Sequence, residues 1–357
     1  MLHRTRLLLL PLIAALCAAL LSAPASAATD SGSRHYRLVW DDFRRGFRDS
    51  GPDARWTYAG YGAFTPNDAV ASTSPRGLRL VSKGVNPRTG EPAFSQTVPQ
   101  DYPLGGALDH AKWVTLTSHQ ASTGFAGFDA VPGYELSCET WLTAHTYGTA
   151  GHPFGPTVPA DDLRLAAAAV NAVDPETGLI FDFFVTDDKV YAFYERSPYY
   201  RDTLGDYASF AFAIPVADRN PATKNHLRIG YDRAAGVVRW YVDGRKVYEV
   251  SRLGHHVSRA NMVLDHGGTQ QDVRPRQLNC GMGMFSVLDG AAPGNPGSGL
   301  VRLTNAQPFY FDPTTGSPAA QHFQDDASLA GSRLFGQGAE LAMDRYVISS
   351  RRVDDND

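Results

Sequence analysis

The segment 227–250 reads LRIGYDRAAGVVRWYVDGRKVYEV, and its side chains alternate in character with a period of two. From Leu227 to Tyr231 apolar residues occupy every second position, and the same alternation returns after a turn. A period of two is typical of a β-strand that buries one face. Asp243-Gly244 then supplies residues that tolerate the positive φ angles of a tight turn. The segment therefore predicts antiparallel strands joined by short turns.

A second hairpin is predicted between Leu179 and Glu195, with its turn at Asp187-Asp188-Lys189. Both faces of its strands carry apolar residues, which is typical of strands covered on both sides. Gly and Pro divide the rest of the chain into short runs rich in Val, Tyr, Phe, Trp and Leu. These runs predict further strands at Tyr36–Trp40, Leu78–Val81, Tyr134–Thr143, Leu165–Val173, Phe210–Pro215, Leu278–Val287, Val301–Leu303 and Arg345–Ser349.

The alanine-rich run Leu165–Val170 is the one place where a helix competes with a strand, because alanine has the highest helix propensity. The run is short and lies among predicted strands, so we expect a strand. Together the segments predict an all-β fold, a two-layer antiparallel β-sandwich of the jelly-roll type. Strand-like sequence continues to Ile348, and residues 28–357 are therefore expected to form a single domain.

The first residues have the features of an export signal. Arg4 and Arg6 give a basic start, Leu7–Leu21 is apolar, and Ala25-Ser26-Ala27 offers a cleavage site. We therefore expect residues 1–27 to be a signal peptide and the mature chain to be secreted and extracellular. Later in the chain, no segment approaches the roughly 20 consecutive apolar residues of a membrane span.

The three cysteines carry different expectations. Cys17 lies inside the apolar leader, and a lipid anchor there is the alternative to cleavage, although attachment prefers a smaller residue than the preceding Leu16. Cys138 and Cys280 remain in the mature chain, and export permits a disulfide between them. Each lies in an apolar, strand-like run, so two separately buried thiols fit equally well. A bridge would contribute roughly 5 kcal/mol in the chain-entropy model.

The net charge bears on the partners of the chain. It is −4 for the whole sequence and becomes −6 once Arg4 and Arg6 are removed with the leader. Nucleic acids and anionic membranes both attract basic surfaces. Neither is therefore an expected partner.

Several phrases resemble the concanavalin A-like lectin/glucanase superfamily, and in particular its laminarinase- and lichenase-type glycosidases. They are Leu38–Phe43 with Arg55-Trp56, Asn225–Gly244, Gln277–Gly283 and Met343–Val347. The mature chain is also similar to a group of uncharacterised secreted proteins of actinobacteria. That likeness rests on Trp40–Phe43, Leu108–His110, Phe128–Gly133 and Gln277–Phe285. The resemblance implies a sandwich fold and export, and it implies a sugar ligand without identifying one.

The same resemblance implies a pair of catalytic carboxylates. The glycosidases of this type carry Glu-x-Asp-x-Glu on one strand, and the period of two places all three carboxyl groups on one face. This sequence has Glu135-Leu136-Ser137-Cys138-Glu139. Glu135 and Glu139 would then be nucleophile and acid/base, with serine in place of the central acid. In these glycosidases the catalytic strand lies closer to the hairpin equivalent to residues 226–250. By that position Phe181-Asp182-Phe183 matches the catalytic strand better, but it contains a single acidic residue.

Aromatic and polar side chains elsewhere fit a sugar-binding groove, because flat rings stack on the CH faces of sugars. The competing interpretation is that most of these rings belong to the core of a large sandwich. The residues that we assign to substrate binding are Trp141, Asp182, Glu195, His226, Arg228, Tyr241 and Asn279.

No sequence pattern indicates a metal or another cofactor. His255, His256 and His266 with Asp265 have no spacing that enforces a common face, so we interpret them as a solvated loop. Calcium needs clustered oxygen ligands, and Asp187-Asp188 and Asp325-Asp326 offer carboxylates without forming a known calcium loop.

Three functions remain open on the sequence alone. The first is a carbohydrate-binding protein whose partner is a polysaccharide or cell-surface glycan. A retaining glycoside hydrolase or transglycosidase is the second, and a non-catalytic envelope scaffold is the third. The sequence leaves the oligomeric state undetermined.

Overall fold

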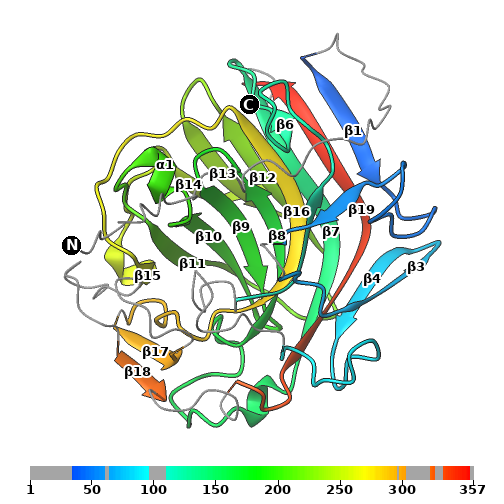
Figure 1. The fold of residues 1–357 in the computed structure, drawn as a ribbon, viewed down its shortest axis with the longest axis vertical. Coiled ribbons are helices and arrows are strands. Elements are labelled where there is room, and N and C mark those ends of the chain that lie inside the picture. The colour runs from blue at the N-terminus through cyan, green and yellow to red at the C-terminus, as the bar shows by residue number, and fades with distance from the viewer. Residues whose placement is uncertain are drawn as a thin grey trace, which may run out of the picture.

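The computed structural model describes residues 34–60, 64–95, 110–295, 297–302, 322–325 and 333–353. Over these residues the chain forms two large antiparallel sheets that pack face to face (Figure 1). The predicted all-β sandwich is therefore confirmed. The predicted signal peptide, residues 1–27, lies outside the described residues.

We call the first sheet sheet A. Within the described residues it has eight strands in the order β14-β13-β12-β7-β19-β4-β3, and β1 pairs with β19 (Figure 1). Its strands are β1 (Tyr36–Asp41), β3 (Val70–Ser74), β4 (Gly77–Ser82), β7 (Tyr134–Tyr147), β12 (Asn225–Asp232), β13 (Val237–Val242), β14 (Arg245–Val250) and β19 (Gly338–Arg352).

The second sheet, sheet B, has nine strands among the described residues, in the order β15-β11-β10-β9-β8-β16-β5-β2, with β6 paired to β16. Its strands are β2 (Trp56–Tyr58), β5 (Ala111–Thr117), β6 (Phe128–Asp129), β8 (Ala166–Val173), β9 (Leu179–Val185), β10 (Lys189–Arg196), β11 (Phe210–Asp218), β15 (Met262–Asp265) and β16 (Gln277–Ser286). Two short strands, β17 (Ser298–Val301) and β18 (His322–Asp325), form a separate parallel pair.

The hairpin that opens the sequence analysis folds as predicted, into β12, β13 and β14. Asp243 has a φ of 51° and Gly244 a φ of 81°, as the tight turn between β13 and β14 requires. The alanine-rich run forms the strand β8, so the expected strand is confirmed over the competing helix. Ala168 and Val170 point into the core, and their neighbours Ala167 and Ala169 are buried on the other face.

The main core lies between the inner faces of the two sheets. Sheet A contributes Leu136 and Leu142 from β7 and Ile229 and Trp240 from the hairpin. These side chains pack against Phe181 and other residues of sheet B. Trp240 also donates a hydrogen bond from Nε1 to the backbone oxygen of Asp182 at 2.8 Å. Because its single polar atom has a hydrogen-bond partner, the indole ring can be buried without the free-energy cost of an unpaired polar group.

Cys138 and Cys280 form a disulfide that joins the two sheets through this core. Cys138 lies on β7 and Cys280 on β16, both sulfur atoms are buried, and the Cα atoms are 5.7 Å apart. The bridge closes a loop with a sequence separation of 142 residues. Since the two sheets have separate hydrogen-bond networks, the disulfide is a direct covalent tie between the layers.

Among the described residues, no helix is both long and apolar enough to cross a bilayer. The longest α-helix there is α1 (Arg201–Leu204), a single turn.

The disulfide makes a testable contribution to stability. A Cys138→Ala, Cys280→Ala double variant should lose about 2–5 kcal/mol in its free energy of unfolding, because the unfolded chain is no longer constrained. Urea denaturation followed by tryptophan fluorescence measures this loss. The unmutated protein in a reducing agent should show a similar decrease, and an unchanged unfolding midpoint in both would contradict the prediction.

Candidate functional site

The structure divides the predicted site residues between two opposite faces of the sandwich. Glu135, Glu139, Trp141, His226, Arg228 and Tyr241 lie on the outer face of sheet A. Asp182, Glu195 and Asn279 lie on the outer face of sheet B. The single groove that we expected from the sequence is therefore wrong, because the core separates the two sets.

Glu135 is enclosed on the outer face of sheet A by two arginines from neighbouring strands. Arg228 donates from Nη1 to Oε1 at 2.6 Å, and Arg239 donates from Nη1 to Oε2 at 3.2 Å. The carboxylate lies over Gly230, where an added Cβ would stand only 2.5 Å from Oε1. Its side chain is 2% exposed. Both oxygens are thus occupied by cations, which does not favour a nucleophile or a general acid at this position.

Glu139 is held in a similar way. Its Oε1 lies 3.2 Å from Nε2 of His226 and 3.5 Å from Nη2 of Arg37. Burial raises the pKa of Glu139, but the contact with His226 and the nearby arginine charges outweigh it and bring the pKa below the ordinary value. A general acid needs the opposite shift. Leu136 and Cys138 face the core and Ser137 points outward, as a period of two along the strand requires, but the sequence could not show these ion pairs.

The two rings on this face are already stacked against charged side chains. Trp141 stacks on His226 with centroids 4.3 Å apart, and the guanidinium carbon of Arg345 lies 4.4 Å from its centroid. His226 comes from β12 and Arg345 from β19, on opposite sides of β7, so both faces of the ring are covered. Arg228 lies 3.8 Å over Tyr241. Trp141 is therefore not free to stack on a sugar, and Arg228 occupies one face of Tyr241.

The outer face of sheet B carries carboxyl groups in a different environment. Asp182 is 4% exposed, and its Oδ1 accepts a hydrogen bond from the backbone nitrogen of Ala172 at 3.3 Å. Burial raises the pKa of Asp182 well above its usual range, against a hydrogen bond from Asn171. Asn279 is 3% exposed, and its Oδ1 accepts from the hydroxyl of Thr117 at 2.5 Å. Both residues are far more buried than a groove would leave them.

Glu195 is the partly buried member of this set. Asp182 on β9 pairs with Phe193 on β10, which makes Glu195 its diagonal neighbour on the same face. Burial, together with the smaller effect of the nearby charge of Asp289, raises the pKa of Glu195 to about 8. A carboxyl group that stays protonated at neutral pH can act as a general acid. Sequence reasoning missed Asp289, because it reaches this face through a long loop.

That loop, residues 287–295, runs from the end of β16 to β15 at the far edge of sheet B, and we call it the covering segment. Val287 packs with Phe184 and Phe193, and the backbone nitrogen of Ala291 donates to the oxygen of Val263 at 2.7 Å. Since β16 and β15 are separated by four strands, the covering segment crosses the outer face of sheet B.

A cleft of about 570 Å³ opens beside the covering segment, and we call it the β17–β18 cleft. Tyr191 and Phe323 contribute rings, and the exposed side chains of His322 and Gln324 lie at its rim. Arg164 and Asp162 form a buried ion pair in its wall, with Nη2 to Oδ2 at 2.8 Å. The full lining is Thr157, Val158, Pro159, Asp161, Asp162, Arg164, Lys189, Tyr191, Pro215, Ala292, Pro293, Asn295, Gly297, Ser298, Gly299, His322, Phe323 and Gln324.

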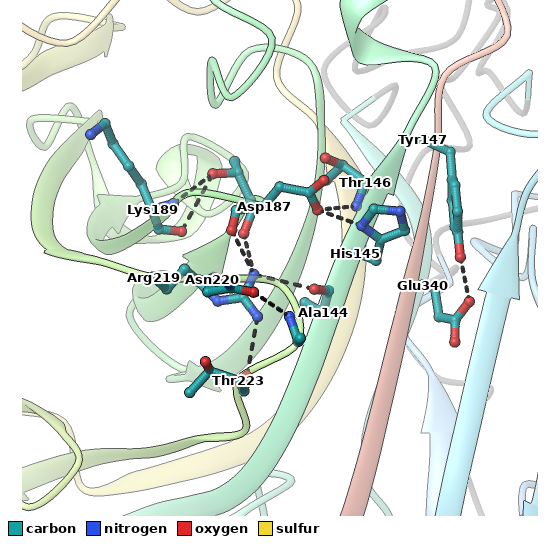
Figure 2. A network of polar contacts seen from close by, with 12 residues as sticks. Ala144, His145, Thr146, Tyr147, Asp187, Lys189, Arg219, Asn220, Thr223 and Glu340 are labelled. Carbon is teal, nitrogen blue, oxygen red and sulfur yellow. Dashed lines mark hydrogen bonds and ion pairs between the residues drawn. The ribbon is translucent and has the colours of Figure 1, made fainter.

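The turn that carries Lys189 into this cleft is fixed to sheet A (Figure 2). Oδ1 of Asp187 accepts from the backbone nitrogen of Thr146 at 2.6 Å and lies 2.9 Å from Nδ1 of His145. Arg219 donates from Nη1 to the backbone oxygen of Thr186 at 2.5 Å and to the backbone oxygen of Ala144 at 3.2 Å. Asp187 thus links the layers rather than offering a free calcium ligand. Within the described residues, no group of three or more metal-ligating side chains comes together.

Gly230 gives a test of the enclosed Glu135. A Gly230→Ala variant should lose roughly 1–3 kcal/mol of stability, because the new methyl group displaces the carboxylate from its two arginines. Gly151→Ala is the matched control, since nothing lies within 4 Å of a Cβ there. Adding Glu135→Ala to Gly230→Ala should cost less than the sum of the two single losses, which thermal or urea unfolding measures. Equal losses for Gly230→Ala and Gly151→Ala would contradict the assignment.

Comparisons with known proteins give relatives of low identity. A protein of Acanthamoeba polyphaga mimivirus, "Uncharacterized protein L829", is 28% identical over 314 residues, which span 73% of this chain and 67% of that protein. The likeness to secreted actinobacterial proteins stays a prediction.

Solved structures with similar arrangements include an endo-1,3-β-glucanase from Streptomyces sioyaensis, at 12% identity and a TM-score of 0.44, covering 92% of this chain and 99% of that one. The apo Crh5 transglycosylase matches at 12% identity and a TM-score of 0.39, covering 89% and 84%. An alginate lyase from a Corynebacterium species matches at 7% identity and a TM-score of 0.32, covering 80% and 82%.

One family model matches residues 40–352, which is most of the chain. The chain therefore belongs to DUF6081, a family of unknown function.

Proposed function

We propose that the chain is a secreted carbohydrate-binding protein of the concanavalin A-like type whose ligand occupies the β17–β18 cleft. The volume of about 570 Å³ lies within the range of roughly 300–1,000 Å³ that small-molecule sites usually have. The wall of the cleft combines apolar surface from Tyr191 and Phe323 with polar groups at Asp161 and His322, which suits a ligand with both CH and hydroxyl groups. This combination is the observation that carries the proposal.

Export is part of the same proposal. The basic and apolar leader at residues 1–27 supports it. The disulfide between Cys138 and Cys280 adds support, because such bonds persist in oxidising compartments outside the cytosol. A partner glycan would then be a polysaccharide or a cell-surface glycan that the secreted chain meets.

The cleft can be tested with variants at its rim. His322→Ala removes an exposed side chain, so the fold should be kept while binding weakens about tenfold on a glycan array and in calorimetric titration with the best glycan. Gln324→Ala should weaken binding similarly, and because it also removes the hydrogen bond from Nε2 to the backbone oxygen of Phe154, thermal unfolding checks its fold first. Glu91→Ala, an exposed change in a distant loop, should bind as the unmutated protein does. Absence of binding across neutral and acidic glycans, or equal binding by all variants, would refute the cleft as the site.

A second candidate function is cleavage of glycosidic bonds on the outer face of sheet B, and the raised pKa of Glu195 favours it. Paired carboxyl groups, one of them protonated, are the groups that such cleavage needs. Asp182 and Glu195 are diagonal neighbours on adjacent strands, where Cβ atoms stand about 7–8 Å apart. Glu195 would serve as the general acid in place of Glu135 or Glu139, whereas Asp182, 4% exposed and with its own pKa raised, does not supply the ionised partner.

Glu195→Gln separates this candidate from simple binding. The variant should lose turnover on any polysaccharide that the protein cleaves, whereas Glu139→Gln should keep it, as a reducing-end assay shows. Because the folded pKa is about 8 and the ordinary value is 4.5, the unmutated protein should lose stability as pH rises from about 4.5 to 8. Glu195→Gln should abolish that decrease, which amounts to roughly 3–5 kcal/mol at pH 8. Unchanged turnover in Glu195→Gln would remove the residue from any catalytic role.

A further inference from the structure

The outer face of sheet A carries a group of arginines that the cleft does not use. We call it the arginine surface, and its members are Arg37, Arg228, Arg239, Arg345 and Arg351. They come from β1, β12, β13 and β19, so residues far apart in the sequence meet on one face.

The pairing of the strands sets the shape of this surface. Arg37, Ser349, Ser137, Gly230 and Arg239 lie side by side on five neighbouring strands. Adjacent strands are about 4.8 Å apart, so the two arginines at the ends of the row stand about 19 Å apart. The three residues between them are small, and the hydroxyl groups of Ser137 and Ser349 lie 2.7 Å from each other. Both serines are 1% exposed and the carboxylate of Glu135 lies over Gly230, so the middle of the row is covered. The more exposed cation of the row is Arg37, at 41% against 20% for Arg239.

Positive charge is in excess on this face. The five arginines and Lys246 accompany four carboxylates, those of Glu135, Glu139, Asp232 and Glu249. Asp232 uses Oδ1 to accept from the backbone nitrogen of Ala235 at 3.1 Å. The balance is two positive charges on one face of a chain whose total charge is −4.

The arginines at the edge keep hydrogen-bonding capacity for a ligand. Arg37 approaches Glu139 only to 3.5 Å, and 41% of its side chain is exposed. Arg351 lies opposite Glu135 across the strand pair and is partly exposed. Glu135 and Glu139 hold the guanidinium groups in place, which lowers the entropy lost when those groups bind an anion. Guanidinium groups bind carboxylate and sulfate in bidentate fashion.

We propose that the arginine surface is a second binding site, which takes an acidic polysaccharide through its carboxylate or sulfate groups. A polysaccharide follows from the proposed function, whereas the site itself stands on the charge and the geometry of sheet A. The overall negative charge of the chain disfavours nucleic acid, whose dense charge needs a wider basic surface. An acidic glycan carries more widely spaced charges, which suits a few separate cations rather than a continuous basic surface.

The test measures binding of the full chain to polygalacturonate, to dextran sulfate and to neutral dextran. The unmutated protein should bind at least one of the acidic polymers at least tenfold more tightly than neutral dextran, and 300 mM salt should weaken that binding relative to 50 mM. An Arg37→Gln, Arg351→Gln double variant should weaken it about tenfold. Arg88→Gln, which removes one positive charge from the exposed loop after β4, should have no effect, whereas Arg37→Gln alone should already weaken binding.

Several results would overturn the proposal. They are equal affinity for neutral and acidic polymers, unchanged affinity in the double variant, or an equal loss in Arg88→Gln. Tight binding of a single-stranded oligonucleotide that the double variant also loses would identify a general polyanion surface instead. His322→Ala and Gln324→Ala should leave the acidic polymers bound, so failure of the cleft and failure of the arginine surface give different results.

Discussion

The alternation of side chains along β7 is the constraint on which the rest of the structure depends. Leu136, Cys138 and Leu142 point into the core, while Glu135 and Glu139 point away from it. The strand lies between β12 and β19 in sheet A and carries one half of the disulfide to sheet B. A shift of register by one residue would place two carboxylates in the core and leave the bridging sulfur outside. The register of β7 therefore determines how β12 and β19 pair with it in sheet A. It also determines where the disulfide joins the two layers and which side chains form the arginine surface.

Local sequence was sufficient for most of the fold, because alternation and turn chemistry act over short distances. The hairpin β12–β13–β14 and the pair β9–β10 were both predicted from their own residues. The strand β8 was predicted against its alanine content, and the structure explains the outcome. Small side chains on both of its faces allow the sheet to be covered on each side, so tertiary packing overrides helix propensity there.

The candidate sites were much less predictable, since they depend on contacts between distant segments. Glu135 and Glu139 matched a catalytic spacing. Their carboxylates are instead held in ion pairs by Arg228 and Arg37, which lie on other strands. Glu195 was named as a binding residue without any sign that its pKa is raised. That shift depends on burial and on Asp289, which is 94 residues away in sequence. No local pattern encodes which face a loop will cross.

The covering segment has a consequence for the shape of any ligand on sheet B. A linear polymer that follows the strands from the side of Glu195 meets the residues that run from β16 to β15. The covering segment therefore lies across this face, and the β17–β18 cleft opens beside it. Such an arrangement favours the terminus of a saccharide, or a short branch, over the interior of a long chain.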